Sequence, residues 1–112
     1  MESILTSIKL MLDYEEVDTG FDPQIIMHIN TALMSLTQIG VGPAEGFEIE
    51  DDTTTWQDFV PNMKKFSGVK SYIYMKVKLA FDSASMSSAL ITAFNEQIKE
   101  LEWRLAHAAE SE

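Results

Sequence analysis

Two histidines, His28 and His107, are the side chains of this 112-residue chain best suited to proton transfer or metal binding near neutral pH. The chain has no cysteine, which excludes thiolate chemistry and disulfides. A catalytic or metal centre needs several convergent groups, and neither histidine has a sequence neighbour at metal-ligand spacing. We therefore expect both histidines to be ordinary polar side chains, and we expect no cofactor and no metal.

The acidic side chains are the next candidates, because an EF-hand calcium loop needs alternate carboxylates, a central glycine and a glutamate at position 12. If such a loop began at Asp13, its sixth position would be Asp18 rather than glycine. If it began at Asp18, its twelfth position would be Ile29. Both registers fail, so the sequence predicts no EF-hand.

The glycines of the 40–46 stretch suggest a dinucleotide-binding loop, which cradles phosphate with free backbone N–H groups at a helix N-terminus. Here the stretch follows a helical pattern rather than a strand, and it contains Pro43. The chain also lacks a P-loop and a nucleophile elbow. We therefore do not expect an enzyme. The enzymatic alternative is a carboxylate site in a deep pocket that a sequence does not reveal.

Composition favours a single domain spanning residues 1–112, with 46% hydrophobic and 23% charged residues. The net charge of −10 argues against general nucleic-acid binding, which relies on Lys and Arg to neutralise phosphates. No apolar run approaches the roughly 18–20 residues that span a bilayer, and the N-terminus lacks a basic signal-peptide region. We expect a soluble protein that is made in the cytoplasm and has no membrane partner.

Charge is unevenly distributed along the chain. Five of the eight basic residues lie between Lys64 and Lys78, whereas acidic residues cluster at 13–22 and 45–58. Solvated faces that maintain solubility would explain this pattern, and the sequence slightly favours that interpretation. The alternative is a pair of complementary patches, through which a surface of one subunit meets the opposite charge on its neighbour.

Helical patterns dominate the chain. A short helix is expected over 3–12, and a longer one from an Asp22 N-cap with Pro23 at the first helical position to about Ile39, ended by Gly40. The predicted buried stripe of the longer helix consists of Ile25, Ile29, Ala32, Leu33 and Leu36. Residues 55–58 resemble a capping box and predict a helical turn or two, with Trp56 in the core.

The segment 67–81 is apolar on nearly every side of its predicted helix, so it must be covered on several sides. A last helix is expected to run to about residue 106, before a frayed tail at 107–112. The apolar residues of this helix form one seam, which consists of Leu90, Ala93, Phe94, Ile98, Leu101 and Leu105. We predict a mainly α domain of four to five helices around the central helix at 67–81. A short loop or β-hairpin is expected at 44–54.

Five side chains are candidates for a subunit or partner interface. Trp103 falls on the polar side of the last helix, and tryptophan is a favoured interface anchor. Met27 and Met34 fall on the polar side of the helix at 22–39. Lys64 and Lys65 open the basic segment and complete the set.

Several segments of the sequence are similar to segments of a known protein family. They are the Phe21-Asp22-Pro23 helix start, Ile39-Gly40-Val41-Gly42-Pro43, Thr55-Trp56-x-x-Phe59, the stretch 69–82, and Asn95-Glu96-Gln97-Ile98-x-x-Leu101-Glu102-Trp103-Arg104-Leu105. Together they cover most of the chain. In them the chain resembles the small head–tail connector, or adaptor, proteins of long-tailed bacteriophages. The resemblance implies a mainly helical fold and a structural protein without catalytic residues or cofactors.

The resemblance also implies a homo-oligomeric ring in the neck of a phage or prophage virion. The ring would join the portal protein to a tail-side stopper or completion protein, and packaged DNA would pass through its lumen without specific binding. The acidic side chains Glu48, Glu50, Asp51 and Asp52 are our candidates for the lumen surface, because carboxylates repel phosphate. The alternative is a small acidic regulator or DNA mimic that binds a basic protein surface.

Overall fold

The computed structural model describes residues 2–110, and its regular elements in that range are helical. In chain order they are α1 (Ile4–Met11), α2 (Asp22–Gln38), α3 (Trp56–Phe59), α4 (Val69–Asp82), the short 3₁₀ helix η1 (Ser83–Ser85) and α5 (Ser88–Glu110). Strand-like pairing within the described range is confined to an isolated antiparallel bridge between Ser3 and Thr55. The prediction of a mainly α domain is therefore confirmed, and the segment 44–54 is a loop rather than a hairpin.

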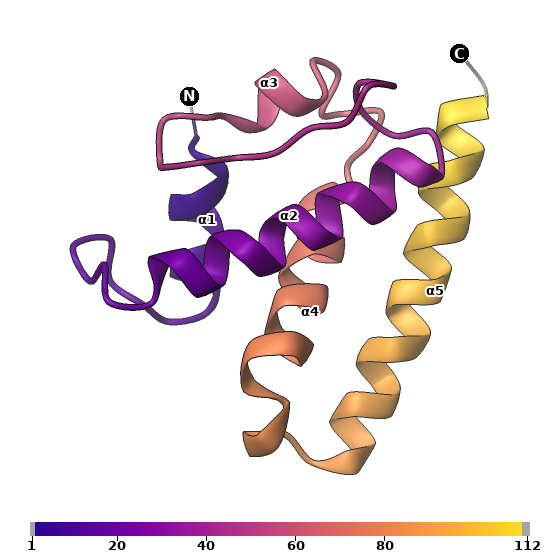
Figure 1. Cartoon of the computed structure of the whole chain (residues 1–112). Helices are drawn as coiled ribbons and strands as arrows, with labels where there is room; N and C mark the ends of the chain where they lie inside the picture. The colour runs from indigo at the N-terminus through magenta and orange to yellow at the C-terminus, as the bar shows by residue number, and fades with distance from the viewer. Residues whose placement is uncertain (1, 111–112) are drawn as a thin grey trace.

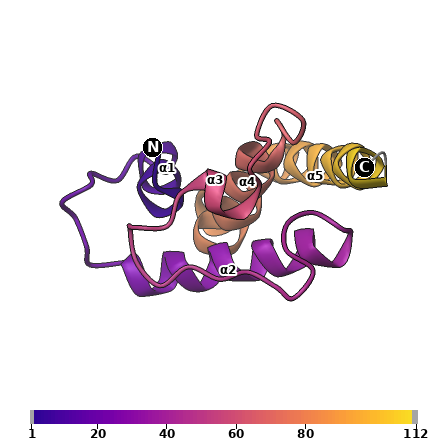
Figure 2. The same cartoon turned by 90° about the horizontal axis from the view of Figure 1, so that it is seen from above.

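Helix α4 lies at the centre of the molecule. It packs against α2 on one side, against α5 on another, and also against α1 (Figures 1 and 2). Five of its side chains are buried by these neighbours, and they are Val69, Tyr72, Ile73, Met75 and Val77. The apolar surface of this helix is thus covered largely from within the chain, as expected for the hub of a small helical domain.

The short helix α3 closes the core above α4. Thr55 and Asp58 form both halves of the predicted capping box, and Trp56 is buried as expected. The Trp56 indole Nε1 donates a hydrogen bond to the Ser7 hydroxyl at 2.9 Å, which satisfies its polar atom inside the core. This bond ties α3 to α1, between residues 49 positions apart in the sequence.

Helix α2 buries the predicted stripe but begins differently from the prediction. Its N-cap is Phe21, without a side-chain cap, and Asp22 lies in the first turn. The Asp22 carboxylate instead lies 3.0 Å from the ammonium of Lys9, a side chain only 3% exposed. The prediction that Asp22 caps α2 is therefore wrong, because the Asp22 carboxylate is paired with the Lys9 ammonium of α1. At the other end Gly40 has φ +93°, the left-handed conformation expected for it.

In the loop at 44–54, the side chain of Asn30 forms hydrogen bonds with the backbone of Ile49 in place of a partner strand. The Asn30 amide accepts from the Ile49 N–H at 2.8 Å and donates to the Ile49 carbonyl at 3.0 Å. This pair of bonds fixes Ile49 in the core against α2. Further along, Asp51 accepts two hydrogen bonds from Thr53, which hold the pKa of the Asp51 carboxyl below its usual value.

Helix α5 is covered mainly over its C-terminal half. Ile98 and Leu105 are buried, whereas Leu90, at the start of the predicted seam, is exposed. The helix continues to Glu110, so the frayed tail predicted from residue 107 is wrong for residues 107–110. The physical reason is packing, since Ala109 lies against the core near Gly40. The rest of the predicted tail, 111–112, lies outside the described residues.

A buried tyrosine joins α4 to α5. The Tyr72 hydroxyl donates a hydrogen bond to the Glu102 carboxylate at 2.7 Å. Burial, followed by this acceptor and its charge, raises the pKa of Tyr72 above the usual tyrosine range. The two helices are therefore linked by a polar bond as well as by apolar packing.

Candidate interaction surfaces

The outer face of α2 carries no charged side chain. Not one Asp, Glu, Lys or Arg occurs from Pro23 to Ala44, in a chain whose charged fraction is 23%. Met27 and Met34 are both exposed on this face, as predicted, and Thr31 is exposed between them. Depletion of charge together with enrichment in methionine is the composition of an interface core rather than of ordinary solvated surface.

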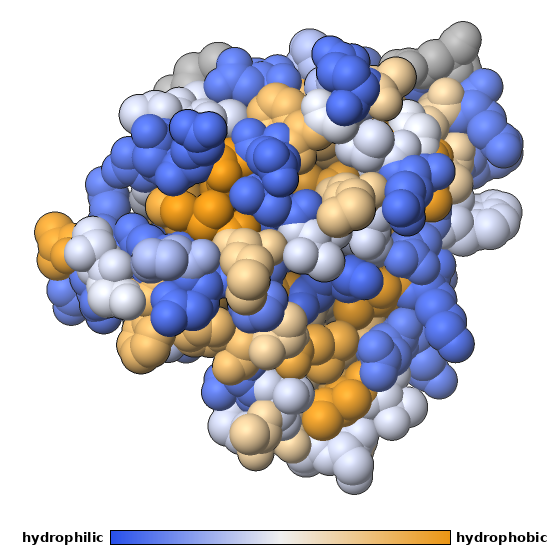
Figure 3. Space-filling view, in the orientation of Figure 1, coloured by the Kyte–Doolittle hydropathy of each residue, from blue (hydrophilic) through white to orange (hydrophobic). Residues whose placement is uncertain are grey.

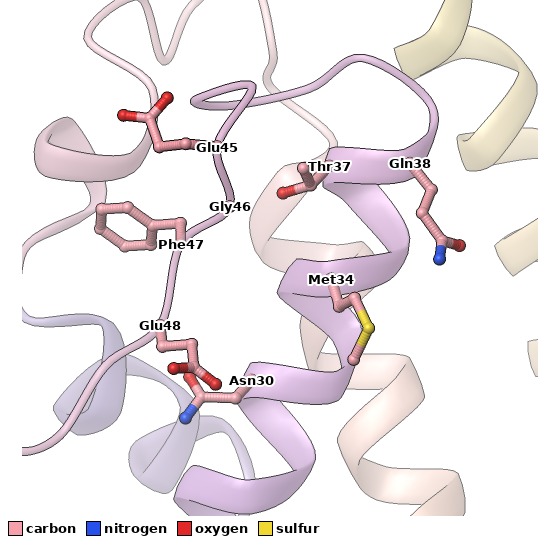
Figure 4. A pocket seen from close by; sticks show the side chains of 8 residues that line it. All are labelled: Asn30, Met34, Thr37, Gln38, Glu45, Gly46, Phe47 and Glu48. Carbon is pink, nitrogen blue, oxygen red and sulfur yellow. The ribbon is translucent and has the colours of Figure 1, made fainter.

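A groove runs between α2 and the 45–48 loop, and Figure 4 shows the side chains that line it. Its volume is about 390 Å³. Thr37 points toward the loop, whereas Met34 forms the outer edge of α2, where its side chain is 57% exposed. Glu48 leans toward Asn30 at one end of the groove (Figure 4). The groove therefore combines an uncharged helix, a flexible thioether and an acidic rim.

Hydrophobic surface also gathers below α2, over the hairpin of α4 and α5 (Figure 3). A shallow hollow at this place is lined by Thr31 of α2, Leu79 of α4 and Ile98 of α5. His28 lines the same hollow, with its ring 6.3 Å from that of Phe81. The uncharged surface of α2 is thus continuous with apolar groups of the hairpin.

Trp103 lies on a different helix, on the exposed face of α5. Its side chain is 69% exposed, in agreement with its predicted place on the polar side. Its indole stacks on the His107 ring, with centroids 5.5 Å apart and planes 4° from parallel. Lys99 precedes Trp103 by one helical turn and is exposed. An aromatic pair with an adjacent cation therefore faces solvent.

The two lysines predicted at an interface lie in the loop before α4, whereas both methionines lie on α2. Lys64 is exposed, and Lys65 lines a hollow with Arg104 and Leu101 of α5. The Lys65 ammonium also lies 5.7 Å from the centroid of the Phe66 ring. The structure thus groups Lys65 with a basic residue of α5 rather than with Met27 or Met34.

The four acidic side chains proposed for the lumen are all exposed in the 44–54 loop. Glu50, Asp51 and Asp52 border a hollow beside Pro23, at the start of α2, whereas Glu48 lies at the groove. Within residues 2–110, no group of three or more His, Cys, Asp or Glu side chains is arranged to hold a metal ion. Nor is any described helix long and apolar enough to cross a membrane.

A family model for phage connector protein matches residues 4–112, almost the whole chain. The chain belongs to the phage connector protein family. The match confirms the resemblance to head–tail connector proteins. A search of curated proteins and a search of solved structures found no match. This connector is accordingly a structural protein of the bacteriophage virion, where it acts among other head and tail proteins.

Sequence reasoning predicted the exposure of Met34 and Trp103 but missed the groove. The exposure of Met34 and Trp103 follows from helical periodicity, which needs only local information. The groove depends on the path of the 45–48 loop, which the Asn30 side chain determines from 19 residues away in sequence. The charge-free stretch from Pro23 to Ala44 is a signal that could have marked this face in advance.

Proposed function

We propose that this connector forms a ring of identical subunits in the neck of the virion. In this proposal the ring binds the portal protein on one side and a tail-side stopper or completion protein on the other. Packaged DNA passes through its lumen without specific binding, and the protein performs no catalysis. The subunits are made in the host cytoplasm, from a phage or prophage gene, before they join the virion.

The observation that carries the proposal is the pairing of family membership with two exposed surfaces of different chemistry. The outer face of α2 is uncharged and rich in methionine, whereas the outer face of α5 presents Trp103 among charged side chains. A ring of identical subunits needs two different patches on each subunit, because its contacts are head to tail. A two-fold dimer would need only one self-complementary patch. The two faces supply the pair that a ring requires.

The acidic loop supports passage of DNA through the ring. Glu50, Asp51 and Asp52 are exposed and close together in sequence, and repetition around a ring would give a band of negative charge. Such a band would repel phosphates and would keep DNA from adhering as it moves. We therefore propose that this part of the loop faces the ring axis.

The test is the mass of the connector in solution, measured alone and after mixing with the portal protein of the same phage. We expect a closed oligomer in at least the mixed sample, and electron microscopy should show rings. A connector that stays monomeric with the portal protein present would contradict the proposal. Binding of the monomer to a basic nucleic-acid enzyme would instead support the acidic-regulator alternative.

A further inference from the structure

We propose that the groove beside Met34 receives the Trp103 face of α5 from a second copy of this chain. The inference rests on the proposed ring, and it names the two surfaces that meet in it. It also gives a register. Lys99, Trp103 and His107 of one copy lie along the groove opposite Glu48, Met34 and Gln38 of the next.

The groove suits an aromatic side chain from outside. Its α2 side is uncharged, and Met34 offers a polarizable thioether at the edge, a group that packs well on aromatic rings. The nearest aromatic ring of its own loop does not fill it. Phe47 turns to the far side of the loop and packs on Phe59, with ring centroids 5.1 Å apart (Figure 4). The volume of about 390 Å³ leaves room for a large side chain.

The Trp103 face has the complementary character. Trp103 and His107 form one stacked, exposed pair of rings, and tryptophan is enriched among the residues that contribute most to binding at protein interfaces. Within residues 2–110, neither Lys99 nor Glu48 forms an ion pair. A contact between copies would bring this cation and this carboxylate together at the edge of the buried rings.

The spacing of the two surfaces agrees with this register. Asn30, Met34 and Gln38 follow one another at four-residue intervals along the groove side of α2. Lys99, Trp103 and His107 have the same four-residue spacing on α5. Equal spacing places the residues of each triplet about 6 Å apart along each helix axis, so the two helices can pair residue for residue. With Trp103 opposite Met34, Lys99 then meets the end of the groove where Glu48 leans toward Asn30.

The groove is lined by α2 and the 45–48 loop, whereas Trp103 belongs to α5. In the proposed ring, each copy receives the Trp103 face of one neighbour in its groove and inserts its own Trp103 face into the groove of the other neighbour. Each contact leaves a free groove at one end and a free Trp103 face at the other. Addition of copies continues until a ring closes.

Cross-linking can test the register, because the chain has no cysteine of its own. One population carries Gln38→Cys and the other His107→Cys, so that Met34 and Trp103 stay intact. A short bismaleimide should join position 38 of one copy to position 107 of the other. The matched control pairs Met27→Cys with His107→Cys, because residue 27 is exposed and lies about three turns from residue 38 along α2. A second control pairs His107→Cys with Val17→Cys, at a side chain 82% exposed in a distant loop.

Charge reversal supplies an independent measurement. Lys99→Glu should weaken association between subunits at least tenfold, and the double variant Lys99→Glu/Glu48→Lys should restore it at unchanged net charge. Trp103→Ala should keep the circular dichroism spectrum of the folded subunit while assembly is lost, because Trp103 is largely exposed. Unfolding of the Trp103→Ala subunit would place Trp103 in the core and overturn the inference.

Failure of the register and failure of the ring are distinguishable. If wild-type rings form while 38–107 cross-links do not exceed either control, the register is wrong and the ring stands. If Trp103→Ala or Lys99→Glu rings form normally but bind the portal protein less, the groove contact is with the portal and the inference is overturned. If the wild-type connector forms no ring with or without the portal protein, the proposed function itself fails.

Discussion

Lys9 is the charged side chain most deeply buried in the described part of the chain, with 3% exposure. Its ammonium donates to the Glu16 carbonyl at 2.9 Å and pairs with the Asp22 carboxylate at 3.0 Å. The first bond holds the loop between α1 and α2, and the second holds the start of α2. Two elements thus depend on one cation, and the start of α2 is held by an ion pair instead of the side-chain cap expected from Asp22.

We expect Lys9→Met to destabilise the connector by about 3 kcal/mol, because it leaves the partly buried Asp22 carboxylate without its cation. The measurement is the free energy of unfolding in urea. Addition of Asp22→Asn to this variant should recover part of the loss, since the uncompensated charge is then removed. The matched control is Lys70→Met, whose ion pair with Glu2 is exposed and should contribute less than about 1 kcal/mol. Equal losses in the two lysine variants would contradict the role of burial.

At the scale of elements, the sequence predicted what local information determines. The buried stripe of α2 and the capping box before Trp56 are each defined by short, fixed spacings in the sequence, and the structure contains both. Three features that local sequence patterns left undetermined depend on partners far apart in the chain. Lys9 forms an ion pair with the Asp22 carboxylate that was expected to cap α2. The Asn30 side chain hydrogen-bonds the Ile49 backbone in the segment where a hairpin was possible. Packing of Ala109 near Gly40 keeps the end of α5 helical.

Two glycines in the loop after α2 differ in whether they pack against a residue distant in the sequence. Gly42 and Gly46 both have positive φ, +89° and +102°, so either glycine would be strained by a side chain. They differ in their surroundings. A Cβ on Gly42 would lie 2.3 Å from the buried ring of Phe59, whereas a Cβ on Gly46 would meet nothing within 4 Å. The close approach of Gly42 to Phe59 thus fastens this loop to α3.

We expect Gly42→Ala to lower the free energy of unfolding by about 3 kcal/mol, from backbone strain and from displacement of a packed ring. Gly46→Ala should cost about 1 kcal/mol, because it adds strain alone. Thermal and urea unfolding of the two variants compare the same substitution in the same loop. If the two losses are equal, the contact between Gly42 and Phe59 contributes nothing to stability.

At the scale of the whole molecule, charge and apolar surface are separated. The outer face of α2 is free of charge from Pro23 to Ala44, and the loop that follows carries Glu50, Asp51 and Asp52 within three residues. In the proposed ring the first surface meets the next subunit, and the loop faces the axis. Glu48 lies between them, so it can reach the subunit contact while the three later carboxylates line the lumen.

This arrangement predicts that Glu50→Lys/Asp52→Lys rings bind duplex DNA, whereas wild-type rings do not. Asp51 is left unchanged because its bonds to Thr53 shape the loop. Fluorescence anisotropy with a short duplex should show binding that weakens steeply with salt, as contacts to phosphates do. The control, Glu15→Lys/Glu16→Lys, makes the same change in charge at exposed positions between α1 and α2. Because a lumen surrounds DNA on all sides, its lysines act together around the ring, and the control should bind at least tenfold more weakly. Equal binding by the two variants would place the 50–52 segment away from the axis.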